Sequence, residues 1–250
     1  MKVSIITAVM NRSDTIEHVI ESVQSQSHRD LEHVIQDGGS QDGTVDIIQR
    51  FSDSRTRLVS ESDMGIYDAI NRGIARSTGD VVGLLHSDDF FPHHDVVSRI
   101  AAAFEDPTVD AVYGDLDYVS ASDSNRVIRR WRAGIASPAK LRHGWMPPHP
   151  TMYLRASVFR ELGVYDTSFE IAADYDAILR FFGTGKVRSA YLPEVLIKMR
   201  LGGASNASLR SILKKSKEDL RALRRNGVGG YGALVLKNVS KIGQFVVRGG

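Results

Sequence analysis

The chain has 250 residues, of which 42% are hydrophobic and 25% are charged, a composition typical of an ordinary globular protein with one large α/β domain and a short appendage. Its formal net charge of +2 is too small for the dense basic surface of a nucleic-acid-binding domain, so we expect no nucleic acid partner. The absence of cysteine excludes disulfides, cysteine-bound zinc and thiol catalysis.

The first nine residues, MKVSIITAV, form a short apolar run that could be mistaken for a signal peptide. Asn11, Arg12 and Asp14 follow at once, and no small-residue cleavage pattern appears. We therefore interpret residues 3–9 as a strand that is buried on both faces. Because no stretch reaches the roughly 18 uncharged apolar residues that span a bilayer, we expect the protein to be cytoplasmic.

The first 90 residues alternate β-branched apolar runs with amphipathic segments, which is the pattern of a parallel sheet with helices on both faces. After the first strand, Ser13 or Asp14 can cap a helix that carries apolar residues at helical spacing. The next elements are expected as a strand at 32–36, a helix at 45–51, a short strand at 58–59, a helix at 67–76 and a strand at 80–86. The carboxyl ends of such strands form a ligand crevice.

From about residue 107 the pattern loosens. It predicts antiparallel-looking strands at 110–119 and 125–133, a Pro-rich turn at 146–150, helices at 156–162 and about 174–183, and a basic amphipathic helix at 206–226. We therefore expect a main α/β domain at 1–204, divided near residue 106 into two halves, and a helical tail at 205–250.

Asp37 closes the second strand and is followed by two glycines and Ser40, which let the backbone turn sharply at the crevice. Its carboxylate could accept hydrogen bonds from a nucleobase N–H or a ribose hydroxyl. The alternative is a plain Asp-Gly turn in which Asp42 caps the next helix.

Asp88 and Asp89 follow a wholly apolar strand, so two adjacent carboxylates lie at its carboxyl end. Adjacent like charges cost free energy unless a cation offsets them. A hard divalent cation that bridges diphosphate oxygens is a common reason for such a pair. The alternative is that both residues cap a helix or turn before Pro92.

Asp174 and Asp176 lie at the start of an apolar helix, where its positive end stabilises acidic side chains. The same place also suits a general base that is aimed into a cleft. On a helix the two residues are about 200° apart, so they cannot both face the cleft.

The segment 206–226 carries an apolar stripe beside a basic stripe, as expected for an amphipathic helix. Its apolar residues are Leu209, Ile212, Leu213, Leu220 and Leu223, and its basic residues are Arg210, Lys214, Lys217, Arg221 and Arg224. Such a helix can lie on an anionic membrane. The alternative is that its apolar face packs on the main domain and its charges are merely solvated.

Five segments of the chain, in the same order, closely resemble those of the family 2 glycosyltransferases, which have the GT-A fold. They are VSIITAVMNR, VIQDGGSQDGT, ESDMGIYDAINRGIARSTGDVVGLLHSDD, PHPTMYLRASVFRELGVYD and AADYDAILR. The resemblance covers about residues 3–200. It implies a nucleotide-sugar-binding half at about 1–106 and an acceptor-binding half at about 107–204.

The resemblance implies an inverting reaction, in which an acceptor hydroxyl displaces the nucleoside diphosphate in one step while Mg²⁺ or Mn²⁺ stabilises the departing charge. Asp37 matches the family's nucleobase-contacting residue, and Asp88 matches its metal ligand. Asp89 is then expected near the sugar or the acceptor. Asp174 matches the family's catalytic base. The sugar donor is expected to be a UDP-sugar.

The chain departs from the family pattern at several positions of the expected nucleotide-sugar site. The common Pro-x-Tyr-Asn segment is here Ala8 to Asn11, so the aromatic ring that would stack on the base is absent. His86 replaces the first acid of the metal-binding motif, which leaves Asp88 as the expected ligand. Ile70 replaces a common arginine, so Asn71 is expected to make more of the sugar-donor contact.

Two further residues of the expected site can be placed by the resemblance. Ala173 replaces the glutamate that precedes the family's base. His149, in the turn PPHPT, matches a histidine that often lies near the donor phosphates; a structural histidine is the alternative. The subgroup with GIYDAINRGI and LLHSDD looks like bacterial enzymes that assemble exopolysaccharide, capsule or lipopolysaccharide, so we expect a glycan or lipid-linked glycan acceptor.

Two other functions are alternatives to glycosyl transfer. A sugar nucleotidyltransferase would carry a Gly-rich loop with Arg or Lys just after the first strand, and AVMNRSD is not such a loop. A catalytically inactive nucleotide-sugar-binding protein is disfavoured because Asp37, Asp88 and Asp174 are all present.

Overall fold

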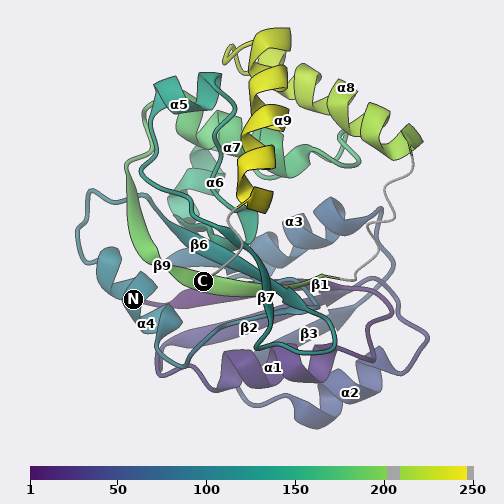
Figure 1. Cartoon of the computed structure of the whole chain (residues 1–250). Coiled ribbons are helices and arrows are strands. Elements are labelled where there is room, and N and C mark those ends of the chain that lie inside the picture. The colour runs from purple at the N-terminus through teal and green to yellow at the C-terminus, as the bar shows by residue number, and fades with distance from the viewer. Residues whose placement is uncertain (202–208, 247–250) are drawn as a thin grey trace.

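The computed structural model describes residues 1–201 and 209–246 and shows one large mixed sheet covered by helices on both faces (Figure 1). Within these residues the sheet has nine strands, in the order β3-β2-β1-β4-β8-β6-β9-β5, with β7 paired to β6. This architecture confirms the predicted α/β fold class.

The N-terminal half is the parallel part of the sheet. Its strands are β1 (Val3–Val9), β2 (Leu31–Asp37), β3 (Thr56–Ser60) and β4 (Val81–Leu84), and all three pairings among them are parallel. Helices α1 (Ile16–Gln24) and α2 (Thr44–Phe51) cover one face, and α3 (Ile66–Arg76) covers the other. β1 is apolar on both faces because it is central and covered on both sides.

The C-terminal half contains strands of both directions. They are β5 (Asp89–Phe90), β6 (Ala111–Ser120), β7 (Val127–Trp131), β8 (Tyr153–Arg155) and β9 (Ser189–Leu201). β6 is antiparallel to β7, as expected from the sequence. It is also antiparallel to β8 and parallel to the long β9, and the sequence pattern revealed neither of these two strands. The helical elements here are α4 (Val96–Ala103), α5 (Pro138–Arg142), the 3-10 turn η1 (His149–Thr151), α6 (Ala156–Leu162) and α7 (Ala173–Gly183).

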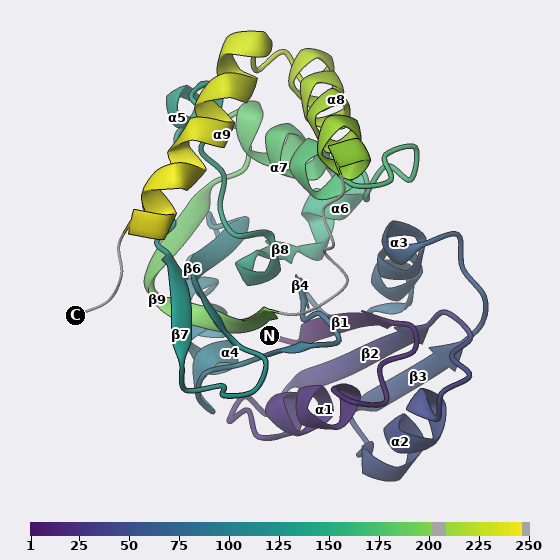
Figure 2. The ribbon, with the colours of Figure 1, turned by 45° about the vertical axis from the view of Figure 1, so that its right-hand side comes forward.

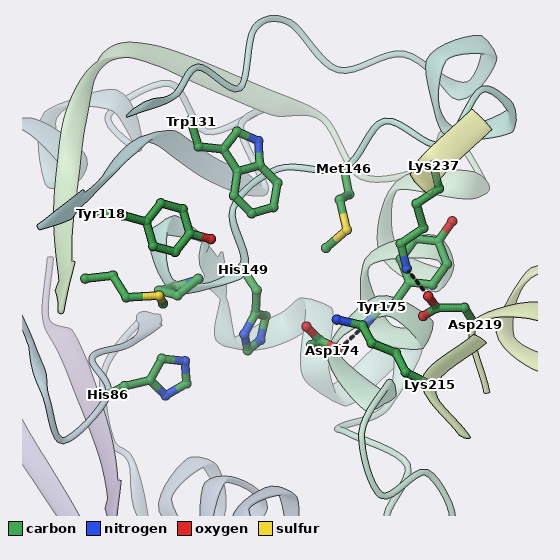
Figure 3. Close-up of a pocket in the computed structure, with 12 residues that line it drawn as sticks. His86, Tyr118, Trp131, Met146, His149, Asp174, Tyr175, Lys215, Asp219 and Lys237 are labelled. Carbon is green, nitrogen blue, oxygen red and sulfur yellow. Dashed lines mark hydrogen bonds and ion pairs between the residues drawn. The ribbon is translucent and has the colours of Figure 1, made fainter. Parts of the chain in front are cut away.

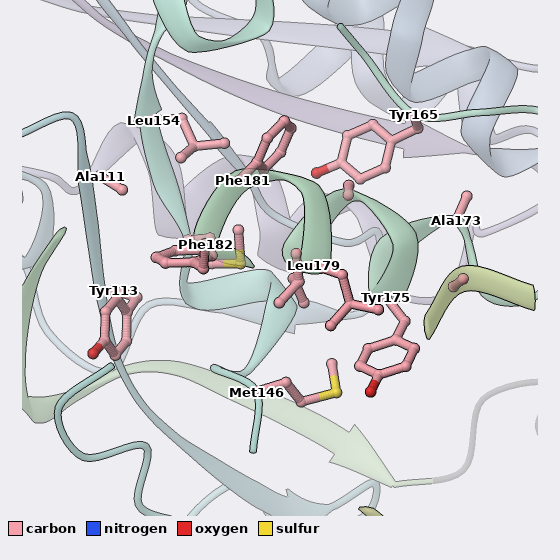
Figure 4. Packing of buried hydrophobic residues seen from close by; sticks show 14 of the residues in the cluster. Ala111, Tyr113, Met146, Leu154, Tyr165, Ala173, Tyr175, Leu179, Phe181 and Phe182 are labelled. Atoms are coloured by element: carbon pink, nitrogen blue, oxygen red, sulfur yellow. The ribbon is translucent and has the colours of Figure 1, made fainter. Parts of the chain in front are cut away.

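Two apolar cores lie on the two faces of the sheet. One is built from α1, α2 and α4 against β1 and β2, and the other from α3, α6 and α7. Figure 4 shows the second core, where Phe182 of α7 packs edge-on against Tyr113 of β6. Close packing leaves no room for a side chain at Gly83, because an added Cβ would lie 2.1 Å from the ring of Tyr153. Tyr153 belongs to the first core, so β4 and β8 are closely packed on that face of the sheet.

The C-terminal tail is a pair of helices, α8 (Leu209–Arg225) and α9 (Tyr231–Val246), folded back onto the main domain (Figures 1 and 2). α8 packs against α7, and α9 packs against α8 and reaches β7. Ala222 and Leu223 are fully buried in the core shared with α7. Among residues 1–201 and 209–246, no helix is long and apolar enough to cross a membrane.

The start of α1 differs from the sequence prediction. Neither Ser13 nor Asp14 caps the helix, whose N-cap is Thr15, without a side-chain cap bond. Instead, Asp42 accepts the Ser13 N–H at 3.0 Å and the Thr44 N–H at 3.1 Å. One carboxylate from the loop after β2 thus orders the starts of both α1 and α2.

Candidate active site

Two adjoining clefts open at the carboxyl ends of β1 and β4. The first, about 190 Å³, is called the β1 cleft and is lined by Ala8, Val9, Met10, Arg12, Asp63, Gly65, Ile66, Ala69 and Ser87. The second, about 220 Å³, is called the α7 cleft and is lined by His86, Tyr118, Trp131, Met146, His149, Pro150, Asp174, Tyr175, Met199, Lys215, Asp219 and Lys237 (Figure 3). The loop after β4 borders both, since Ser87 lines one cleft and His86 lines the other.

Asp37 is completely buried at the end of β2, beneath the loop that follows it. Its carboxylate accepts the backbone N–H of Gly39 at 2.9 Å and of Ser40 at 3.0 Å, and the hydroxyls of Ser40 and Ser60. Burial by itself raises the pKa of Asp37, but these hydrogen bonds outweigh it and the pKa is lowered. Here the ionised carboxylate shapes the loop, and its contact with a nucleobase stays a prediction.

Asn11 links the loop after β1 to the loop after β2. Its N–H donates to the Ser40 hydroxyl at 2.8 Å, and its side-chain oxygen accepts the Gln41 N–H at 3.0 Å. Its φ of 51° is in the left-handed region, which asparagine tolerates better than most residues. Ala8 and Asn11 therefore lie together at the β1 cleft, Ala8 in its wall and Asn11 in the loop that shapes it.

Asn71 lies on α3 and is tied to the backbone of Tyr165. Its side-chain amide donates to the Tyr165 carbonyl at 2.7 Å, and its side-chain oxygen accepts the Tyr165 N–H at 3.0 Å. Both ends of the side chain are thus engaged in holding the segment before α7. This geometry does not favour the predicted contact of Asn71 with a sugar donor.

The acidic pair after β4 contains two different kinds of carboxyl. Asp88 is half-buried, and Arg200 of β9 donates to its backbone carbonyl at 2.8 Å. Asp89 is fully buried, and neither of its carboxyl oxygens has a hydrogen-bond partner among residues 1–201 and 209–246. Burial and then the nearby charge of Asp88 raise the pKa of Asp89 well above its usual range.

The register of the sheet shows where Asp89 points. Asp89 of β5 lies opposite Met199 of β9, and Met199 lies opposite Tyr118 of β6. Directly paired residues project from the same face of a sheet. Because Met199 and Tyr118 line the α7 cleft, the Asp89 carboxyl lies on the face of the sheet that forms its floor.

A divalent metal fits this site only together with a phosphorylated ligand. The described residues contain no group of three or more His, Asp or Glu side chains that could hold a metal on their own. Asp88 lines neither cleft, but it is half-buried and directly follows Ser87, which lines the β1 cleft. Mg²⁺ is commonly bound by one or two carboxylates and completed by substrate phosphates and water, which is the arrangement that Asp88 permits.

Asp174 lines the α7 cleft from the first turn of α7 (Figure 3). Its Oδ1 atom lies 3.5 Å from the Tyr67 hydroxyl, which donates to the Ile171 carbonyl at 2.8 Å. His86 and His149 line the same cleft, and their ring centroids lie 6.0 Å apart. Asp174 is therefore a carboxylate on the wall of the cleft, beside a phenol and in the same cleft as two imidazoles.

His149 is both buried and part of the cleft wall. Its Nε2 atom is hydrogen-bonded to the Tyr165 hydroxyl at 2.8 Å. Burial lowers its pKa to about 4, and burial also lowers the pKa of His86. Both rings are thus neutral near pH 7 and can donate or accept one hydrogen bond each. His149 is therefore hydrogen-bonded within the protein, as a structural histidine would be, and it also lines the cleft. Its contact with the donor phosphates stays a prediction.

Several lining residues were not found by sequence reasoning. Arg200 donates toward the Asp88 backbone, and Trp131, Lys215 and Lys237 line the α7 cleft. Trp145 is partly buried against the second core, and its indole N–H donates to the Ala133 carbonyl at 2.6 Å. The missed residues lie on β7, β9, α8 and α9, whose positions near the cleft depend on tertiary packing.

The fold and the clefts define an α/β enzyme with a nucleotide-type crevice at the carboxyl ends of parallel strands. The family model described as "Glycosyl transferase family 2" matches residues 4–169. The chain therefore belongs to glycosyl transferase family 2, which confirms the family and the enzyme class expected from the sequence and decides against a sugar nucleotidyltransferase.

Two bacterial glycosyltransferases are similar to this chain in sequence, which agrees with the family assignment. An uncharacterized glycosyltransferase of Mycobacterium tuberculosis is 33% identical over 186 residues, covering 71% of this chain and 68% of that protein. A PGL/p-HBAD biosynthesis glycosyltransferase of Mycobacterium bovis is 30% identical over 208 residues, covering 81% of this chain and 78% of that protein.

Solved structures show the same fold at low sequence identity. TarS of S. aureus in complex with UDP-GlcNAc has a TM-score of 0.69 and 15% identity, covering 91% of this chain and 66% of that one. The mannosyltransferase PcManGT of Pyrobaculum calidifontis, in complex with GDP-Man and Mn²⁺, has a TM-score of 0.68 and 18% identity, covering 94% of this chain and 68% of that one. The fold is thus of the GT-A type.

Proposed function

We propose that this enzyme moves a sugar, with inversion, from a nucleotide-sugar to a hydroxyl of a growing cell-surface glycan. The observation that carries the proposal is the loop after β4, which borders both clefts: Ser87 lines the β1 cleft, His86 lines the α7 cleft, and Asp88 follows. A nucleotide in the β1 cleft would bring its diphosphate to Asp88. Its sugar would then reach the α7 cleft, where Asp174 lies.

The nucleotide is proposed to occupy the β1 cleft, with its base toward Ala8 and the loop that Asp37 and Asn11 shape. UDP is the proposed nucleotide, and the UDP-GlcNAc bound to TarS supports it. Asp88 would hold Mg²⁺ or Mn²⁺, and the Mn²⁺ complex of PcManGT supports a metal in this fold. When bound, such an ion neutralises the charge that develops on the departing diphosphate.

In the proposed step Asp174 accepts the proton of the acceptor hydroxyl. The hydroxyl oxygen forms a bond to the anomeric carbon as the bond from that carbon to the diphosphate oxygen breaks, and the nucleoside diphosphate leaves. Neutral His86 and His149 line the same cleft, where each can orient one polar group of the sugar or phosphate.

The acceptor is proposed to be a glycan, carried on a lipid at the cytoplasmic face of the membrane. Trp131 and Tyr118 on one wall of the α7 cleft provide aromatic surface for a sugar ring. The PGL/p-HBAD biosynthesis relative supports a product of the cell envelope. Leu213, Tyr231 and Val235, all more than half exposed on the tail, support peripheral contact with a membrane.

A panel of nucleotide-sugars tests the proposal. The purified full chain is mixed with UDP-, GDP-, CDP- and dTDP-sugars with and without Mn²⁺, and thermal stabilisation and release of the nucleoside diphosphate are measured. The expected result is stabilisation and slow hydrolysis with one class of sugar donor, only when Mn²⁺ or Mg²⁺ is present. Failure of every nucleotide-sugar to stabilise the protein, with either metal, would contradict the proposal.

A further inference from the structure

The C-terminal helix pair forms one wall of the α7 cleft. Lys215 and Asp219 of α8 and Lys237 of α9 line the cleft together with Asp174 and Tyr175 of α7 (Figure 3). The tail is therefore placed where it can act on the group proposed as the base.

Glu218 of α8 binds the backbone immediately before Asp174. Its carboxylate accepts the N–H of Glu170 at 3.3 Å, of Ile171 at 2.9 Å and of Ala172 at 3.0 Å. Ala172 is the N-cap of α7, so the three amides that Glu218 binds are those of the N-cap and of the two residues before it, at the positive end of the helix. Glu218 supplies both an acceptor for these amides and a negative charge at that end of the helix.

The residues after Asp174 are also held by the tail. Asn226 donates to Asp176 at 2.9 Å. Lys237 and Asp219 form a buried ion pair at 2.7 Å, and the Lys237 ammonium lies 3.2 Å from the centroid of the Tyr175 ring. The chain on both sides of Asp174 is thus fixed by α8 and α9.

We propose that Glu218 is a positioning residue, which holds the start of α7 so that the Asp174 carboxylate faces the acceptor hydroxyl. This inference rests on the proposed function, in which Asp174 is the base. Movement of a base by about 1 Å can cost on the order of 100-fold in rate. A carboxylate that fixes three successive amides restricts that movement without contacting the substrate.

The test is Glu218→Gln in the full chain. Glutamine keeps the size of the side chain and one acceptor oxygen, but its NH₂ group cannot accept from a backbone amide and the negative charge is lost. We expect kcat for transfer to fall about tenfold or more, with KM for the nucleotide-sugar and the affinity for UDP with Mn²⁺ unchanged. Hydrogen exchange at residues 170–172 should become faster.

Glu170→Gln is the matched control. Glu170 forms an ion pair with Lys214 of α8, so this variant also removes one carboxylate that joins the loop to the tail. Its side chain is 71% exposed and bonds no backbone amide among the described residues, so we expect normal kcat and normal exchange at residues 170–172.

A folded Glu218→Gln protein with wild-type kcat would overturn the positioning role, while the proposed function would stand if Asp174→Asn still abolished transfer. Equal loss of kcat in Glu170→Gln and Glu218→Gln would overturn the positioning role as well.

If Glu218→Gln does not fold, Asn226→Ser is the second test, because it removes the hydrogen bond to Asp176 in the same turn of α7. Reduced kcat with unchanged KM would then support the role of the tail, and unchanged kcat would overturn it. A wild-type chain that transfers no sugar would instead contradict the proposed function.

Discussion

Asp174 and Asp176 project in different directions from the first turn of α7. Asp174 lines the cleft, whereas Asp176 is buried, accepts a hydrogen bond from Asn226 at 2.9 Å and lies 3.6 Å from the Arg180 guanidinium. Helical geometry alone predicted that only one of them could face the cleft. The structure shows which one it is.

Asp174→Asn should therefore abolish most transfer without changing binding. The amide keeps the shape of the carboxylate but accepts no proton, so we expect transfer to fall by a factor on the order of 100 or more. Calorimetry should find the affinity for UDP with Mn²⁺ unchanged. Asp176→Asn should mainly lower the free energy of unfolding, by about 1–3 kcal/mol, because it weakens a buried pair. If Asp174→Asn transferred sugar at near the wild-type rate while Asp176→Asn did not, the assignment of Asp174 as the base would be wrong.

Asp88→Asn should weaken the metal-dependent part of nucleotide binding. An amide lacks the charge that a hard divalent cation requires, so we expect the affinity for UDP with Mn²⁺ to fall at least about tenfold. The affinity for UDP without metal, measured in the same calorimeter, is the internal control and should be unchanged. Equal Mn²⁺ enhancement in the variant and the wild type would rule out Asp88 as the ligand.

The parallel half of the fold could be predicted closely from the sequence. β1 and α3 carry uninterrupted apolar or 3.6-residue patterns, and the structure places them at Val3–Val9 and Ile66–Arg76. β9 was missed because most of Ser189–Leu201 is only half-buried and Pro193 interrupts its pattern. The pairing of β9 with β6 joins residues about 80 positions apart, which no local pattern encodes.

The candidate site was predictable where it follows strand ends and was not where it depends on distant helices. Asp88 and Asp174 lie at element ends that the sequence revealed. The hydrogen bonds that saturate Asp37 depend partly on Ser60, which reaches it from β3. Glu218 lies far along the chain from Asp174, in a helix whose charge pattern resembles an ordinary solvated face. Its role follows only from tertiary contacts.

The stability of the protein should fall in acid because His33 is buried in its neutral form. His33 is 1% exposed, and burial lowers its pKa from 6.5 to about 3. In the unfolded chain it binds a proton below about pH 6.5, so its contribution to stability is complete above that pH and is lost as the pH falls toward 3. His33→Gln should reduce the slope of unfolding free energy against pH by about 1 kcal/mol per pH unit between pH 5 and 6.

Urea unfolding of the wild type and His33→Gln at several pH values gives this slope. The pKa of Asp89 is raised by folding, so its effect on the pH dependence of stability is opposite to that of His33. Asp89 is present in both proteins, so its effect cancels when their slopes are subtracted. Identical slopes in the two proteins would show that His33 is not held neutral.

The last prediction concerns the outer face of the tail. Its inner face packs on the domain, since Ala222 and Leu223 are buried, whereas Leu213, Tyr231 and Val235 are 64%, 66% and 59% exposed. The two alternatives for the tail, packing on the main domain and contact with a membrane, are therefore compatible. One face of the tail packs on the domain, and the exposed side chains on the other face could contact a membrane. We expect the full chain to co-sediment with anionic vesicles at low salt and to be released at about 1 M salt, where charges are screened beyond about 3 Å.

The double variant Tyr231→Ser, Val235→Ser should lose most of this binding, because it removes apolar area that would enter the headgroup region. Met64→Ser is the matched control, since Met64 is 83% exposed but belongs to the loop just before α3 and not to α8 or α9. Equal loss in the control would mean that exposed apolar area in general, and not the tail, drives sedimentation. No binding of the wild-type chain at low salt would leave α8 and α9 with a purely intramolecular role, in which they form a wall of the cleft and hold the turn that carries Asp174.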